Sequence, residues 1–234
     1  MENIADYTVE TDKNGELMIT KYNGHDPYII IPSEYEGKPI TTVYCTTLLD
    51  CDFIKGIKVS EGITWVDKDE VYFESDKIVE FGFCGCQTYE ELTLPSTLEH
   101  MGSLEHSENL KEIVIPDGVE GLELGAFYGC ASLERVVLPQ SMTTISGNCF
   151  TSCTNLTEVV LPEKLEAIAK AAFSGTAITE FRLPDTMEHV YGAPFPKGAK
   201  VYMSKALAEK TLDTGNTFLD LFKTECYGTE YVVE

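Results

Sequence analysis

Apolar positions recur along the middle of the chain at a nearly constant interval. Five prolines, spaced 21, 23, 23 and 22 residues apart, are Pro95, Pro116, Pro139, Pro162 and Pro184. The segments that they lead share the pattern L-P-x-x-L-x-x-I-x-x-x-A-F-x-x-C-x-x-L-x-x-V-x. A period in the twenties that keeps its apolar positions in register is typical of stacked coils, because each coil buries its apolar face only against the next. The pattern therefore predicts a repeat solenoid.

Three columns of the repeat predict its core. Phenylalanines stand 11 residues after four of the prolines, at Phe127, Phe150, Phe173 and Phe195. Other apolar side chains stand three residues after a proline, at Leu98, Val119, Met142, Leu165 and Met187. Cysteines stand nine residues before a proline, at Cys86, Cys130 and Cys153, and Cys51 has the same spacing to Ser60. We expect these columns to point inward, with the cysteines packed as small, free hydrophobic residues.

The composite pattern resembles the bacterial leucine-rich repeats of the BspA type, which share the proline-led strand and the A-F-x-x-C segment. The match spans Asn14 to Tyr202, and GELMITKYNGHDPYIIIPSEYEGKPITTV is similar to the opening of such arrays. Two places depart from the pattern: 12 residues over Asp67 to Ile78 look inserted, and the coil of Leu104 is short and lacks A-F-x-x-C. The pattern and the resemblance together predict an α/β solenoid of 21–23-residue coils with a parallel sheet on one face.

The chain is expected to form a single leucine-rich repeat domain over residues 1–234, with a cap and first strand over 1–31, repeats over 32–200 and a C-terminal cap over 201–234. At the start, YTVET and ELMITKY flank DKNG, whose Asn14 and Gly15 favour a hairpin turn. Near the end, SKALAEKTL offers Ser204 as a helix N-cap, with Leu207 and Leu212 on one helical side, and TFLDLFK follows. Such segments would cover the exposed strand edges and apolar ends of a solenoid.

Charge narrows the classes of partner. The chain has 39 acidic and 17 basic residues, a formal net charge of −22, which disfavours nucleic acid because phosphate binding needs clustered Lys and Arg. No run approaches the ~18 apolar residues of a spanning helix, which disfavours membrane insertion. The start, MENIADYTVE, has neither the basic nor the apolar region of a signal peptide. An exported protein that has lost its signal and a cytoplasmic protein both remain open.

Strand alternation predicts which side chains leave the core. If Val136 and Leu138 point inward, then Arg135 and Val137 point outward. The same parity places an outward column two residues before each proline or its equivalent, at Lys58, Thr93, Val114, Val137, Val160 and Arg182. We take as the candidate partner-binding face the six residues Glu112, Val114, Arg135, Val137, Glu158 and Val160. The competing interpretation is an ordinary solvated surface, since valine is favoured on any pleated sheet.

Few residues suggest a catalytic or metal-binding site. No nucleophile elbow, phosphate loop or paired-carboxylate motif is present, so we expect a non-enzyme without a cofactor or metal. The four histidines, at His25, His100, His106 and His189, show no ligand spacing. Of the eight cysteines, Cys84 and Cys86 are the best candidates for a zinc site, although the repeat already accounts for Cys86. Neighbouring coils, ~5 Å apart, would also allow disulfides.

These observations predict a non-catalytic recognition module that binds a protein, or less readily a glycan, on its repeat sheet. The resemblance implies a bacterial adhesion protein at the cell surface or secreted. The alternative is a cytoplasmic structural or scaffolding repeat protein without an extracellular ligand, which reduced cysteines and the absence of a signal peptide favour.

Overall fold

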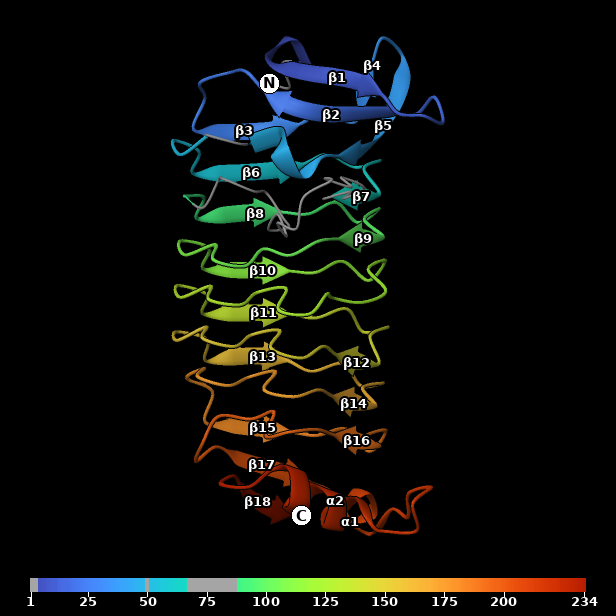
Figure 1. The fold of residues 1–234 in the computed structure, drawn as a ribbon, viewed down its shortest axis with the longest axis vertical. Helices are drawn as coiled ribbons and strands as arrows, with labels where there is room; N and C mark the ends of the chain where they lie inside the picture. The colour runs from blue at the N-terminus through green and yellow to red at the C-terminus, as the bar shows by residue number, and fades with distance from the viewer. Residues whose placement is uncertain (1–3, 49–50, 67–87) are drawn as a thin grey trace, which may run out of the picture.

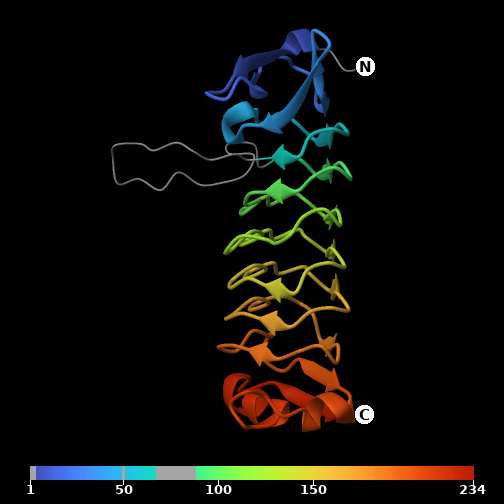
Figure 2. The ribbon, with the colours of Figure 1, turned by 90° about the vertical axis from the view of Figure 1, so that its right-hand side faces the viewer.

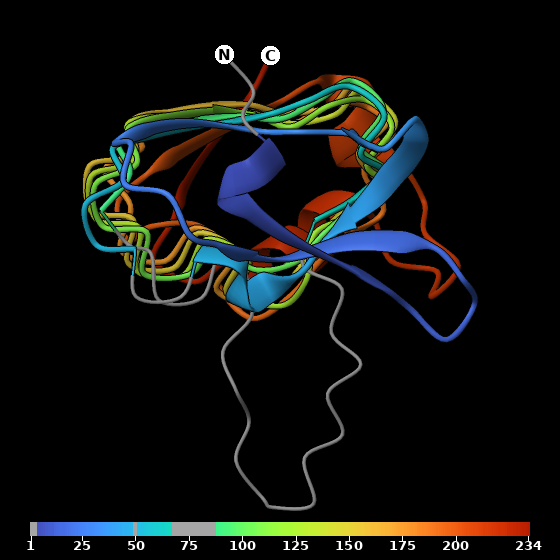
Figure 3. The ribbon, with the colours of Figure 1, turned by 90° about the horizontal axis from the view of Figure 1, so that it is seen from above.

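The coils of the chain stack into one elongated solenoid (Figures 1 and 2). This computed structural model describes residues 4–48, 51–66 and 88–234. The N-terminal strands lie at one end of the stack, and two short helices with the last strand lie at the other (Figure 1). Viewed along the stack, successive coils superimpose on one flattened outline (Figure 3). The insertion expected over residues 67–78 lies outside the described residues.

Six parallel strands form one face, here called the front sheet, in the order β13-β11-β10-β8-β6-β3. Their bounds are β3 Tyr28–Ile31, β6 Gly56–Val59, β8 Glu91–Thr93, β10 Glu112–Val114, β11 Arg135–Val137 and β13 Glu158–Val160. In the regular coils, residues one repeat apart are paired: Glu112 with Arg135, and Arg135 with Glu158. A proline follows five of these six strands within two residues, and Ser60 takes its place after β6. Proline turns the chain out of the sheet because it lacks the N–H that would continue the ladder.

A second ladder of short parallel strands runs along another side of the stack, where the sequence led us to expect only one sheet. Its described strands form two sheets that do not pair with each other. One contains β5 Lys38–Val43, β7 Trp65–Val66 and β9 His100–Met101, and the other contains β12 Thr144–Ile145, β14 Ala167–Ile168 and β16 His189–Val190. From β12 to β16 these are the fifth and sixth residues after a proline. The chain is extended there because each coil must cross between two turns, and the sixth residue is buried at Ile145, Ile168 and Val190.

The repeats consist of strands and turns, which corrects the expectation of an α/β solenoid. Among the described residues, the α-helices are α1 Lys205–Glu209 and α2 Phe218–Glu225, both after the last coil. Short 3-10 helices occur at Ile4–Asp6 and Cys45–Leu48. The segments that close the coils opposite the front sheet are turns.

Antiparallel strands begin the stack. β1 Tyr7–Thr11 pairs with β2 Leu17–Tyr22, and β4 Glu34–Tyr35 pairs with β5. The first turn is organised by Asp12, whose carboxylate accepts hydrogen bonds from the backbone N–H groups of Asn14 at 2.8 Å and Glu16 at 2.9 Å. Within this turn only Gly15 has a positive φ, of 85°, a conformation that glycine adopts without steric cost.

A separate sheet and the two helices end the stack. Parallel strands β15 Glu180–Arg182, β17 Lys200–Met203 and β18 Glu230–Val233 form this sheet. The Ser204 hydroxyl caps α1 by accepting from the N–H of Leu207. Helix α2 begins with a capping box between Thr217 and Asp220. The expectation that Leu212 shares a helical side with Leu207 is wrong, since α1 ends at Glu209 and Leu212 lies beyond it.

The core is a continuous column of apolar side chains between the two ladders. All four phenylalanines of the repeat column are buried. Phe173 nevertheless does not stack on Phe195, because Phe181 of β15 lies between them, with ring centroids at 5.0 and 4.8 Å. The position of Phe181 holds valine in β11 and β13, and only the larger ring reaches the column. Phe195 then contacts Phe222 of α2 at 6.0 Å, which joins the last coil to the helix.

Candidate partner-binding face

Strands β10, β11 and β13 place alternate side chains on opposite sides of the front sheet. The middle residue of β11, Val136, is fully buried, and Ile113 of β10 is 2% exposed. Val114 and Val160 are exposed by 57% and 38%, and Val137 between them is half-buried. The ladder holds these three valines in register, Val114 beside Val137 and Val137 beside Val160. The structure therefore brings the predicted valines together as one outward band.

A row of charged residues runs beside this valine band. Glu112 and Glu158 are exposed, and Arg135 between them is half-buried. The guanidinium Nε of Arg135 lies 3.1 Å from Oε1 of Glu158, with both side chains substantially exposed. Exposed ion pairs of this kind contribute only about 0–1 kcal/mol to stability. Within the described residues Glu112 forms no ion pair, so its carboxylate is available to a partner.

The outward column is shorter than the sequence predicted. Lys58, Thr93, Val114, Val137 and Val160 belong to the front sheet, but Arg182 lies on β15, in the separate C-terminal sheet. Its guanidinium pairs with Glu234 at 3.0 Å and lies over the ring of Tyr202 at 4.5 Å. The repeat from Pro162 to Pro184 is one residue short, and β15 does not pair with β13. The continuous face therefore ends at Val160.

The front sheet opens between β8 and β10, a feature that the sequence analysis missed. Only Glu112 and Glu91 are in register there, whereas three residue pairs join β6 to β8 and β10 to β11. The opening forms a groove of about 460 Å³. Its lining is Leu92, Leu94, Ile113, Val114 and Pro116, with Glu61, Thr93, Ser96 and Glu112. The signal that could have located it is the spacing of Pro95 and Pro116, two residues shorter than the regular repeat.

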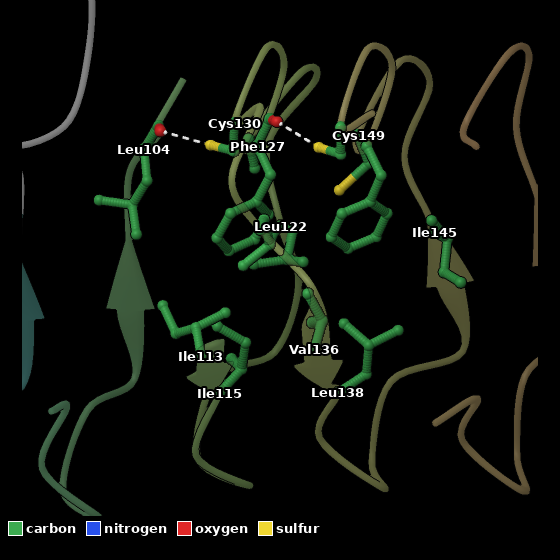
Figure 4. Close-up of a cluster of buried hydrophobic side chains, with 14 of the residues drawn as sticks. Leu104, Ile113, Ile115, Leu122, Phe127, Cys130, Val136, Leu138, Ile145 and Cys149 are labelled. Carbon is green, nitrogen blue, oxygen red and sulfur yellow. Dashed lines mark hydrogen bonds between the residues drawn. The ribbon is translucent and has the colours of Figure 1, made fainter. Parts of the chain in front are cut away.

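Five cysteines are part of the core. Cys51, Cys130, Cys149, Cys153 and Cys226 are all free and buried. The thiol of Cys130 donates to the carbonyl of Leu104 at 3.1 Å (Figure 4), and that of Cys153 donates to the carbonyl of Phe127 at 3.0 Å. Hydrogen bonding to Cys153 and burial raise the pKa of Cys130, and burial raises that of Cys149. Neutral, buried thiols of this kind are poor nucleophiles.

Possible metal ligands are scattered over the part of the chain that the structure describes. No cluster of three or more His, Cys, Asp or Glu side chains is placed there to hold an ion. His100 and His189 lie on different strands of the second ladder, both exposed, and His189 stacks on Tyr191 at 5.6 Å. The zinc candidates Cys84 and Cys86 lie outside the described residues.

No described helix is long and apolar enough to span a bilayer.

Comparisons with known proteins agree with this architecture. The sequence profile of the BspA type leucine-rich repeat region matches six copies over residues 76–200. A leucine-rich repeat protein of T. pallidum, 19% identical, superimposes with a TM-score of 0.66 over 100% of both chains. A leucine-rich cell surface protein of Faecalibacterium prausnitzii, 20% identical, gives a TM-score of 0.68 over 89% of this chain and 55% of that one. No curated protein matches the chain. Since the profile covers more than half of its residues, the chain belongs to the BspA-type leucine-rich repeat family.

Proposed function

We propose that the protein is a non-catalytic recognition module that binds a protein partner on the front sheet. The observation that carries the proposal is the outward band of exposed Val114, half-buried Val137 and exposed Val160, in register on adjacent strands. Protein interfaces typically have an apolar centre depleted of charge and a polar rim. The valine band beside Glu112, Arg135 and Glu158 has this arrangement. Solenoids commonly bind partners along such extended surfaces.

A protein ligand fits this face better than a glycan. Sugars are typically held by aromatic rings that stack on them and by dense polar contacts, and β10, β11 and β13 carry no aromatic side chain. Aliphatic side chains gain most from contact with other apolar side chains, about 25 cal/mol for each Å² removed from water. The net charge of −22 further favours a partner whose contact surface is basic.

We further propose a role for the two terminal segments and a location for the protein. Residues 1–31 and 201–234 act as caps that cover the two ends of the repeats over 32–200 within one domain. We place the protein at the cell surface or outside the cell, where it would act in adhesion. Support comes from the F. prausnitzii protein of similar fold, which is described as a cell surface protein. The free state of the described cysteines favours the alternative, a scaffold in the reducing cytoplasm.

Photocrosslinking tests the proposed face. We would incorporate p-benzoylphenylalanine at position 137, irradiate the protein with a panel of purified bacterial and host extracellular proteins, and identify the crosslinked species. The matched control carries the photoreactive residue at position 124, because Leu124 is also an exposed aliphatic residue, 71% exposed, but lies off the front sheet. We expect a crosslinked partner only from position 137. Crosslinking from position 124 alone, or from neither position, would contradict the proposal.

A further inference from the structure

We propose that the groove between β8 and β10 is the anchor of the partner-binding face, and that it takes an aliphatic side chain from an extended partner segment in which lysine or arginine flanks that side chain. This inference rests on the proposed function and adds the place and chemistry of the contact. It depends on three properties of the groove: its opening in the ladder, its apolar lining and its acidic rim.

The opening follows from the length of one repeat. The coil from Pro95 to Pro116 is two residues shorter than the next, and only the first residues of β8 and β10 are in register. Leu94 at the open end of β8 remains half-buried, whereas Leu138, at the equivalent position beside paired strands, is 1% exposed. An apolar side chain that is covered at Ile31, Val59 and Leu138 is therefore partly accessible here, as it is at Leu161 beside the end of the sheet.

The lining of the groove selects an aliphatic group. Leu92, Leu94, Ile113, Val114 and Pro116 are the apolar residues of its lining, and no aromatic ring among the described residues lines it. Its volume of about 460 Å³ is within the ~300–1,000 Å³ of typical ligand pockets. One leucine or isoleucine side chain and the adjacent backbone of a partner would fit within this space. Val114 lines the groove and is also the first residue of the valine band. The groove is therefore continuous with that band.

The acidic rim of the groove favours positive charge next to the aliphatic side chain that enters it. The Glu61 carboxylate is held in place by the backbone N–H and hydroxyl of Ser96, at 3.2 and 2.9 Å. These hydrogen bonds lower the pKa of Glu61, which keeps it ionised. Within the described residues, Glu91 and Glu112 form no ion pairs, and Lys58 is the one cation among the outward residues of β6, β8 and β10.

An extended segment satisfies both requirements at once. Successive side chains of an extended chain point to opposite sides and rise ~3.3 Å per residue. When one side chain enters the groove, its two neighbours lie over the rim, where Glu61 and Glu112 are found. Long lysine or arginine side chains can turn back toward those carboxylates while their aliphatic stems cover the groove edges.

Peptide titrations followed by NMR test this inference. The probes are the acetylated and amidated peptides GKLKG, GKSKG and GELEG, added to the full ¹⁵N-labelled chain. We expect GKLKG to shift the backbone amides of Leu92 to Leu94 and of Ile113 and Val114. Its affinity should exceed that of GKSKG, which has the same charge, and that of GELEG by about tenfold, the effect of ~1.4 kcal/mol.

Two charge reversals provide the matched control. Glu112→Lys at the groove rim should weaken GKLKG binding about fivefold, whereas Glu120→Lys changes the net charge equally but lies outside the lining and should leave affinity unchanged. Equal weakening by both variants, or equal binding of GKLKG and GKSKG, would show attraction to overall charge and overturn the inference. Shifts confined to Val137 and Val160 would overturn the groove while leaving the face intact. Absence of any shift with GKLKG also overturns the groove, whereas the proposed function is judged by crosslinking.

Discussion

The rings of Phe127 and Phe150 stack with centroids 5.3 Å apart and planes inclined by 9°. Phe150 and Phe173 repeat this relationship with the same distance and angle. Equivalent rings in successive coils thus lie one above another along the core. Every coil must hold its neighbours at this spacing for the front sheet to remain continuous, so the packing of the core and the geometry of the binding face are coupled.

We expect Phe150→Ala to lower the free energy of unfolding by about 3–5 kcal/mol, the usual cost of deleting a buried aromatic ring. The ring is fully buried and contacts a ring on each side, so its loss leaves a cavity that the stack cannot close. Chemical denaturation checks the value. Tyr227→Ala removes a ring that is 76% exposed and should change stability little. Equal midpoints for Phe150→Ala and the parent would mean that the ring column does not form.

Alkaline pH should weaken the fold through its buried thiols. Burial raises the pKa of Cys149 above its ordinary value of 9.0. Its contribution to stability is therefore complete below pH 9, where the thiol is protonated in both states, and falls at higher pH, where only the unfolded chain ionises. Above pH 9, each buried thiol that stays protonated only in the folded state lowers the free energy of unfolding by about 1.4 kcal/mol per pH unit.

Cys149→Ala isolates this effect, because Ala126 and Ala172 hold the equivalent positions in the neighbouring coils. The variant should lose about 1 kcal/mol at pH 7 from the missing sulfur. Above pH 9, its stability should fall less steeply than that of the parent. Urea denaturation at pH 7, 9, 10 and 10.5 measures both quantities. Parallel stability curves for the two proteins would show that Cys149 ionises equally in the folded and unfolded chains.

The short coil also brings two backbones into close approach at Gly118. A Cβ added there would lie 2.6 Å from the carbonyl oxygen of Leu98, so Gly118→Ala should force the coils apart and cost about 1–3 kcal/mol. Gly121→Ala is the matched control, since its Cβ would meet nothing within 4 Å, and it should be neutral or stabilise by about 0.4–1 kcal/mol. Thermal denaturation compares them, and equal stability of the two variants would contradict the close approach.

The sequence predicted the parts of this structure that repeat. Proline spacing located the coils, and strand parity placed Val114, Val137 and Val160 on one outward band. The second ladder was missed because its strands after β5 are two residues long, too short to show an alternation of apolar and polar positions. Phe181 was not singled out in the sequence analysis. Its size, and the missing residue before it, put its ring between those of Phe173 and Phe195.

The groove between β8 and β10 could not be predicted for a related reason. A shorter spacing of Pro95 and Pro116 shows that residues are missing, but not whether the stack closes over the gap or opens. That outcome depends on backbone contacts such as the approach of Gly118 to Leu98, shortly after the two strands. Such contacts have no signature in residue type beyond the glycine itself.

The most direct test of a binding face on the front sheet is the dissociation constant of the crosslinked partner for Val137→Glu. A charge placed in the centre of the valine band should leave folding intact and weaken binding about 30-fold, because an unpaired interfacial charge costs ~2 kcal/mol. Leu124→Glu is the control, since it puts the same charge on an exposed aliphatic position off the sheet. We expect weaker binding for Val137→Glu and parental affinity for Leu124→Glu. Equal affinity of the two variants would contradict a binding face on the front sheet.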